Sequence, residues 1–158
     1  MNTTLKLFVS LVLCLGAGGL GALFTTPAIT GWYAALKKPI FNPPNWLFGP
    51  AWTILYLLMG IALFLVWNQK LPFSEVRIAI ILFAVQLGLN ILWSALFFGL
   101  KLPLAGLIEI TVLWVAILLT IIYFYPISHG AGILLVPYIL WVSFATALNA
   151  AIVFLNRT

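Results

Sequence analysis

Charged side chains are scarce in this chain of 158 residues: they make up 6% of it, and only two of them, Glu75 and Glu109, are acidic. A soluble domain carries about 25% charged residues, and a fold of this length leaves much of its surface in contact with solvent. With 65% hydrophobic residues, the chain is neither a soluble enzyme nor a disordered segment. We therefore expect lipid to surround it.

Cysteine and histidine occur once each, as Cys14 and His129. A single cysteine excludes an intrachain disulfide and a cysteine-based zinc site. No residue spacing is typical of a metal site, a phosphate loop or a hydrolytic triad, so we predict no metal and no required cofactor. The seven basic residues are scattered near the ends of apolar stretches, as in membrane helices, which argues against nucleic acid as a partner.

Long apolar stretches predict five membrane-spanning helices. A span needs about 20 residues, and the runs lack the alternation of a β-barrel. Short connections after the second, third and fourth helices predict antiparallel neighbours. We predict one all-α integral membrane domain over residues 1–158, a five-helix bundle with helices at about 5–25, 44–67, 76–100, 102–125 and 131–156.

The first connection, residues 26–43, is longer than the others and is full of rigid apolar groups such as Trp32, Tyr33 and Pro43. Loops of this length often act as lids or binding loops. An interfacial anchor is the alternative, because Trp and Tyr favour the headgroup level of a bilayer. We favour the lid, since anchoring alone would not need so long and stiff a segment.

The basic residues also predict an orientation. An odd number of spans puts the termini on opposite sides, and four of the seven basic residues fall on the side of the first connection and the C-terminus. Because cytoplasmic loops are enriched in Lys and Arg, that side is predicted to face the cytoplasm.

Three predicted spans each carry aromatic and polar residues along one helical face. An unpaired polar group in hydrocarbon costs several kcal/mol, so these faces should point at other helices or at a cavity. Interhelical hydrogen bonds would explain one such face, but three together favour a shared cavity for a flat, mostly apolar ligand. The faces comprise Trp52 and Tyr56, then Gln86, Asn90 and Trp93, then Tyr138, Trp141, Ala145 and Asn149.

Two further features leave alternatives open. Glu109 lies inside an apolar stretch, where it either pairs with Lys101 or a loop amide, or contacts a ligand. Small residues on the first span, and Ala84 with Gly88 on the third, allow close helix packing, and the third span offers a seam for a homodimer.

Four runs of residues resemble the translocator protein family, which includes the tryptophan-rich sensory proteins and homologues of the peripheral benzodiazepine receptor. In chain order they are WYAALKKP at 32–39, PP at 43–44 with WTILY at 52–56, QLGLNILW at 86–93 and PYILWVSFATALN at 137–149. Length, span count and the order of the motifs agree over nearly the whole chain.

The resemblance implies a five-helix bundle, often dimeric, that binds porphyrins such as protoporphyrin IX and haem, and also sterols and benzodiazepine-type ligands, under its first loop. It also implies a link between Trp52, Trp141 and light-dependent porphyrin breakdown, as in some bacterial members. The sterol motif of the family needs a tyrosine, and residues 148–157 offer only Phe154. By position, the pocket residues implied are Tyr33, Pro43, Trp52, Asn90, Trp141 and Ala145.

We therefore predict a receptor or sensor in a bacterial cell envelope membrane that binds tetrapyrroles between its helices, for sensing, sequestration or transport. A light-dependent porphyrin-degrading enzyme that uses Trp52 and Trp141 is the alternative. The predicted ligand-binding residues are Trp32, Tyr33, Pro43, Trp52, Tyr56, Gln86, Asn90, Trp93, Tyr138, Trp141, Ala145 and Asn149.

Overall fold

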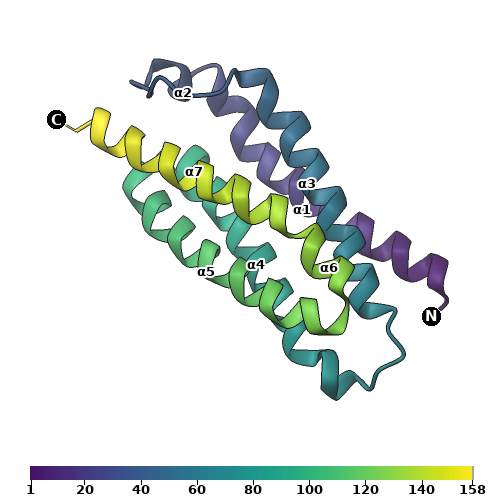
Figure 1. The fold of residues 1–158 in the computed structure, drawn as a ribbon. Coiled ribbons are helices and arrows are strands. Elements are labelled where there is room, and N and C mark those ends of the chain that lie inside the picture. The colour runs from purple at the N-terminus through teal and green to yellow at the C-terminus, as the bar shows by residue number, and fades with distance from the viewer. Residues whose placement is uncertain (158) are drawn as a thin grey trace.

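The computed structural model describes residues 1–157 and shows an elongated helical bundle, with no strand in that range (Figure 1). Five helices are long and apolar enough to cross a membrane, as predicted. The elements are α1 (Thr3–Ile29), α2 (Trp32–Ala35), α3 (Asn45–Trp67), α4 (Phe73–Ser94), the π-helical turn η1 (Ala95–Gly99), α5 (Pro103–Ile127), α6 (His129–Leu134) and α7 (Val136–Leu155).

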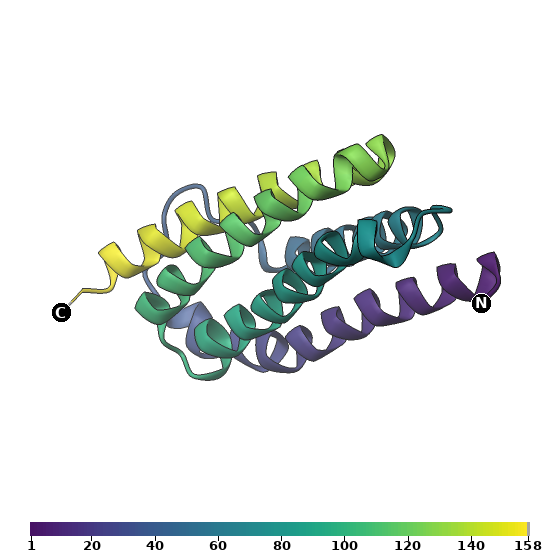
Figure 2. The ribbon, with the colours of Figure 1, turned by 90° about the horizontal axis from the view of Figure 1, so that it is seen from below.

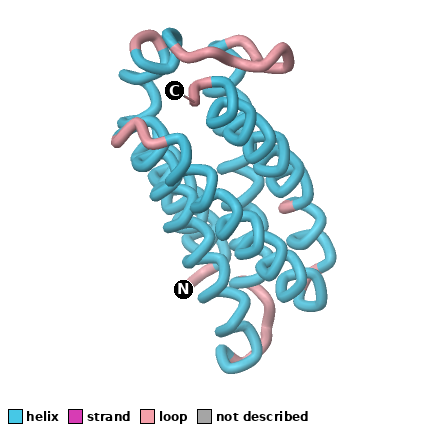
Figure 3. Tube along the Cα trace, turned by 90° about the vertical axis from the view of Figure 1, so that its left-hand side faces the viewer, coloured by secondary structure: helices cyan, strands magenta, loops and turns pink. Residues whose placement is uncertain are grey.

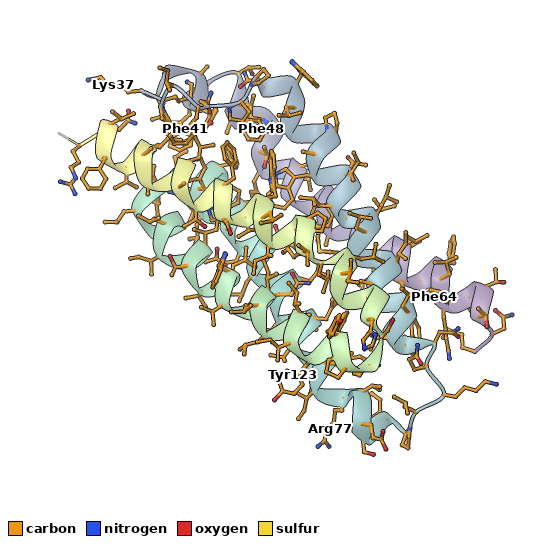
Figure 4. All side chains as sticks on the ribbon, in the orientation of Figure 1. Lys37, Phe41, Phe48, Phe64, Arg77 and Tyr123 are labelled. Atoms are coloured by element: carbon orange, nitrogen blue, oxygen red, sulfur yellow. The ribbon has the colours of Figure 1, made fainter. Side chains whose placement is uncertain are left out.

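Apolar side chains cover the outside of this bundle as well as its core. Leu23, Ile54 and Leu140 are 57–70% exposed, whereas Met59 and Val142 are fully buried between helices. Figure 4 shows side chains of this kind projecting along the whole length of the bundle. An exposed apolar belt is stable in a bilayer, because lipid tails replace water as the solvent.

The first helix is longer than the predicted range 5–25, because it continues through Pro27 to Ile29. Proline lacks an N–H group, so Pro27 removes the helical hydrogen bond to the carbonyl four residues earlier, in the last turn of α1. The first connection consequently begins after Ile29 rather than at residue 26, and it contains the short helix α2 before α3 starts at Asn45.

The third span, predicted at 76–100, begins at Phe73 and ends in a wide π-helical turn. There the N–H of Leu100 donates to the carbonyl of Ala95, five residues earlier, over 2.7 Å. The wider turn leaves two consecutive side chains, Phe97 and Phe98, both buried. The fourth span, predicted at 102–125, follows as α5 and runs two residues further, to Ile127.

The fifth span, predicted at 131–156, is interrupted. It consists of α6 and α7, which meet at Leu135, and Pro137 lies in the first turn of α7, where its missing N–H costs little. The break between α6 and α7 agrees with the position of Pro137, which interrupts an apolar run of the sequence. His129 is exposed and begins α6, with its ring stacked on Tyr125 at 4.5 Å between centroids.

The two ends of the bundle differ. The first connection and the C-terminus lie at one end and the N-terminus lies at the other, as five spans require (Figures 1 and 2). Figure 3 shows most of the non-helical chain gathered at the end that holds the first connection. In Figure 4, Lys37, Phe41 and Phe48 mark that end, and Arg77 marks the opposite one.

Candidate functional site

Aromatic side chains from five elements, α2, α3, α4, η1 and α7, meet around a cavity at the end of the bundle that holds α2. Six predicted site residues line it: Tyr33, Trp52, Trp93, Trp141, Ala145 and Asn149. The remaining lining residues are Thr25, Phe48, Phe97, Phe98, Phe144 and Leu148. The aromatic faces predicted on three spans therefore reach a common space.

The rings around this aromatic cavity contact one another mostly edge to face. Trp52 and Trp141 lie 6.2 Å apart between centroids at an interplanar angle of 85°, and Phe48 meets Trp141 at 6.5 Å and 78°. Trp93 instead stacks on Phe97 at 5.2 Å and 22°. Pairs of this kind gain roughly 0.5–1.5 kcal/mol beyond their buried area, so the rings form a cohesive lining.

The aromatic cavity is small in this structure, about 20 Å³. That volume holds roughly one water molecule, whereas pockets for drug-sized ligands measure about 300–1,000 Å³. Rings must therefore move before this cavity can hold a larger guest.

Two indole N–H groups in the lining differ in their partners. The N–H of Trp93 donates to Asn149 Oδ1 at 3.0 Å, and Asn149 Nδ2 donates to the carbonyl of Pro103 at 2.8 Å. The N–H of Trp141 is buried and has no hydrogen-bond partner within residues 1–157. A buried unpaired donor costs roughly 1–3 kcal/mol, so an acceptor on a bound molecule would stabilise this indole.

The first connection packs against the same end of the bundle. The Tyr33 hydroxyl donates to Asn42 Oδ1 at 2.6 Å, and Phe41 packs on Phe144 with 6.0 Å between ring centroids. Burial raises the pKa of Tyr33 to about 12, so its hydroxyl stays protonated at neutral pH. The connection is thus tied to the rings that line the aromatic cavity.

A second tie joins the first connection to the end of α7. Asn156 Oδ1 accepts from the Lys37 backbone N–H at 3.0 Å, and Asn156 Nδ2 donates to the Lys37 carbonyl at 2.9 Å. The Lys38 ammonium group donates to the carbonyls of Tyr33, Ala34 and Leu36, and these bonds pair backbone acceptors at the C-terminal end of α2.

Four predicted site residues form a separate polar network deeper in the bundle. Tyr56 donates to Asn90 Oδ1 at 3.1 Å, and Asn90 Nδ2 donates to the Tyr138 hydroxyl at 2.7 Å. Tyr138 in turn donates to Gln86 Oε1 at 2.7 Å. All four are at most 5% exposed and join α3, α4 and α7. None of the four lines the aromatic cavity.

The other predicted residues lie around these two groups. Trp32 packs its edge against Phe97 at 5.5 Å, and Pro43 is buried at the end of the connection, but neither lines the aromatic cavity. Glu109 is buried, and its carboxyl oxygens have no hydrogen-bond partner in the described chain. Of the two alternatives for this residue, the pairing with Lys101 or a loop amide is therefore not found, and contact with a ligand stays a prediction.

Six lining residues were missed, and most of them continue a predicted face. Phe48 lies four residues before Trp52, and Phe97 lies four residues after Trp93, so helical periodicity alone would have found both. Phe144 and Leu148 lie three and seven residues after Trp141 on the same face. Phe98 carries no such signal, because the π-helical turn places it, and neither does Thr25 on α1.

Comparison with known proteins matches residues 8–155 to the TspO/MBR family. Tryptophan-rich protein TspO of Archaeoglobus fulgidus is 51% identical over 152 residues, which cover 96% of this chain and 97% of that protein. Tryptophan-rich protein TspO of Chlorobaculum tepidum is 48% identical over 152 residues, or 96% of each chain. The human Translocator protein is 38% identical over 119 residues, covering 75% of this chain and 70% of that protein.

These matches span nearly the whole chain and agree with its five apolar helices. The chain is therefore an integral membrane protein that belongs to the TspO/MBR family of membrane sensor and translocator proteins.

Proposed function

We propose that this protein binds tetrapyrroles, such as protoporphyrin IX and haem, among the rings that line the aromatic cavity, and so senses, sequesters or moves them. The observation that carries the proposal is the meeting of rings from α2, α3, α4, η1 and α7 around one space. A flat macrocycle gains most from stacking and edge contacts with such rings.

The polar groups of the lining fit the same class of ligand. The unpaired N–H of Trp141 would donate to a carboxylate or another acceptor of the ligand. Asn149 also lines this space, but its side-chain amide already bonds to Trp93 and to the Pro103 carbonyl and is not free to bind a ligand. A mostly apolar molecule with a small number of acceptors would therefore bind here.

We further propose that the first connection acts as a lid. Its residues Tyr33 and Phe41 contact the lining, and its backbone at Lys37 is tied to Asn156. Since the aromatic cavity is now too small for a macrocycle, ligand entry requires these contacts and the rings beneath them to shift.

Titration of the purified protein with protoporphyrin IX in the dark tests the proposal. We expect quenching of tryptophan fluorescence with an affinity of about 1–10 μM. Replacing both Trp52→Phe and Trp141→Phe should weaken binding by about tenfold or more, because an indole donor and ring area are lost. Trp67→Phe, at the far end of α3, is the matched control and should bind as the wild type does.

If the double variant keeps the wild-type affinity, the aromatic cavity is not the site. If the wild type does not bind protoporphyrin IX, the proposed ligand class is wrong. Light-dependent breakdown of porphyrin stays a prediction, and the same titration under illumination in air checks it through the appearance of a new absorbing product that needs Trp52 and Trp141.

A further inference from the structure

A larger groove lies beside the aromatic cavity, between α1 and the first half of α3. Its volume is about 530 Å³, which falls within the range of about 300–1,000 Å³ typical of ligand sites. Several of its lining residues are exposed on the outside of the bundle, so in a membrane the groove opens towards lipid. It is lined by Leu15, Gly18, Gly19, Gly21, Ala22, Thr25, Thr26, Ile29, Thr30, Asn45, Trp46, Phe48, Gly49, Trp52, Thr53, Tyr56 and Ser94.

Small residues on both helices create this groove. Gly18 and Gly21 allow α1 to approach closely, since a Cβ atom there would lie 2.7 Å from the Tyr56 ring and 3.3 Å from Ser94 Oγ. Gly19 and Gly49 face open space instead, with no atom within 4 Å of the position that a Cβ would take. On α1, Gly18 and Gly21 thus lie against α3 and α4, whereas Gly19 faces free volume beside them.

The groove and the aromatic cavity share part of their walls. Thr25, Phe48 and Trp52 line both. A molecule in the groove consequently contacts the same indole that lines the aromatic cavity, and movement of Phe48 or Trp52 would join the two spaces.

Several polar groups of the groove lie at one end. Thr26, Thr30 and Asn45 lie where α1 ends and α3 begins, at the end of the bundle that holds α2. Deeper in the groove the lining is mostly apolar or small, with Leu15, Gly19 and Ala22. The polar residues there are Ser94 and Tyr56, and the Tyr56 hydroxyl already donates to Asn90. The hydroxyls of Thr25 and Thr53 bond to carbonyls of their own helices at 3.0 and 2.8 Å and are already satisfied.

We propose that this groove is a loading site, which takes a flat amphipathic ring system from the bilayer and passes it to the aromatic cavity. The polar end of the groove would hold the polar substituents of the ligand near the headgroups, and the apolar part would hold its ring. This inference rests on the proposed function, because the cavity must be the destination. The sizes support the order of events: the groove has room for a ligand, whereas the aromatic cavity has none until its rings part.

Association rates test the proposal, with protoporphyrin IX as the probe and the full chain in lipid nanodiscs. Gly19→Leu fills the groove from α1, and Gly49→Leu fills it from α3. Both positions have free space, so the fold should persist, and leucine has a higher helix propensity than glycine. Gly16→Leu is the matched control, because a Cβ at Gly16 would also have no atom within 4 Å, yet Gly16 does not line the groove.

Stopped-flow quenching of tryptophan fluorescence should show association slowed about tenfold in Gly19→Leu and Gly49→Leu, with the wild-type rate retained in Gly16→Leu. Wild-type rates in both groove variants, with circular dichroism showing them folded, would overturn the proposal and leave the groove to lipid chains. Equal slowing in all three variants would overturn it too. Failure of the proposed function looks different, because the wild type itself would then give no quenching.

Discussion

The polar network and the aromatic cavity are built from the same helices but differ in how completely their groups are paired. In the network, Tyr56, Asn90, Tyr138 and Gln86 each have a hydrogen-bond partner and are at most 5% exposed. In the cavity, the Trp141 indole N–H has no partner in the described residues, and Trp52 and Trp141 are only partly buried. A fully paired cluster stabilises the fold. An unpaired buried donor, in contrast, gains a hydrogen bond only when a ligand supplies an acceptor.

Breaking the network should give the largest effect on stability. Asn90→Leu removes the acceptor for Tyr56 and the donor to Tyr138, which should lower the free energy of unfolding by about 1–3 kcal/mol. Unfolding in mixed micelles measures this. Asn68→Leu, at the C-cap of α3, is the control and should change it by less than about 0.5 kcal/mol.

The ligand affinity of Asn90→Leu tests the same comparison in a second way. Folded Asn90→Leu should bind protoporphyrin IX as the wild type does, since Asn90 does not line the aromatic cavity. Unchanged stability together with a large loss of affinity would instead make Asn90 a ligand contact, and the distinction between the two regions would fail.

A smaller effect is expected from releasing the first connection. Asn156→Ala removes both hydrogen bonds to the Lys37 backbone, which are exposed and so contribute modestly. Dissociation of protoporphyrin IX should become about three- to fivefold faster, with little change in the free energy of unfolding. Asn68→Ala, also at a helix C-cap but at the opposite end of the bundle, should leave the dissociation rate unchanged; equal rates in both variants would contradict the lid.

The smallest effect concerns Tyr33 and appears only at high pH. A tyrosine ionises near 10.0 in the unfolded chain, whereas the pKa of Tyr33 in the folded protein is about 12. The folded state therefore retains this proton more tightly, and the stability that it contributes is complete below pH 10 and lost as the pH rises from 10 to 12. Melting temperatures of the wild type and of Tyr33→Phe should thus converge over that interval; convergence below pH 9 would show that Tyr33 is not protected.

The sequence predicts the five spans well because hydropathy and turn residues act locally. It predicts the first connection less well, since nothing local shows that α1 continues through Pro27. The gathering of Trp52, Trp93 and Trp141 follows from helical faces that must avoid lipid.

Helical periodicity in the sequence does not show which polar residues join the network and which line the cavity. Asn90 and Asn149 look alike in sequence, yet Asn90 bonds to Tyr56 and Tyr138, whereas Asn149 bonds to Trp93 beside the cavity. The choice depends on the rotation and depth of each helix, which tertiary packing decides. The groove was also not predicted, because the same glycines are consistent with close packing along the whole of α1.

The π-helical turn at Ala95–Gly99 has a consequence for how this architecture arises and is lost. Such a turn is equivalent to one inserted amino acid that bulges from the helix while the flanking turns keep their phase, so deleting a single residue there would restore an ordinary α-helix. Phe97 and Phe98 could then no longer both face inward. A one-residue deletion would thereby produce a more regular helix but remove one ring from the lining of the aromatic cavity.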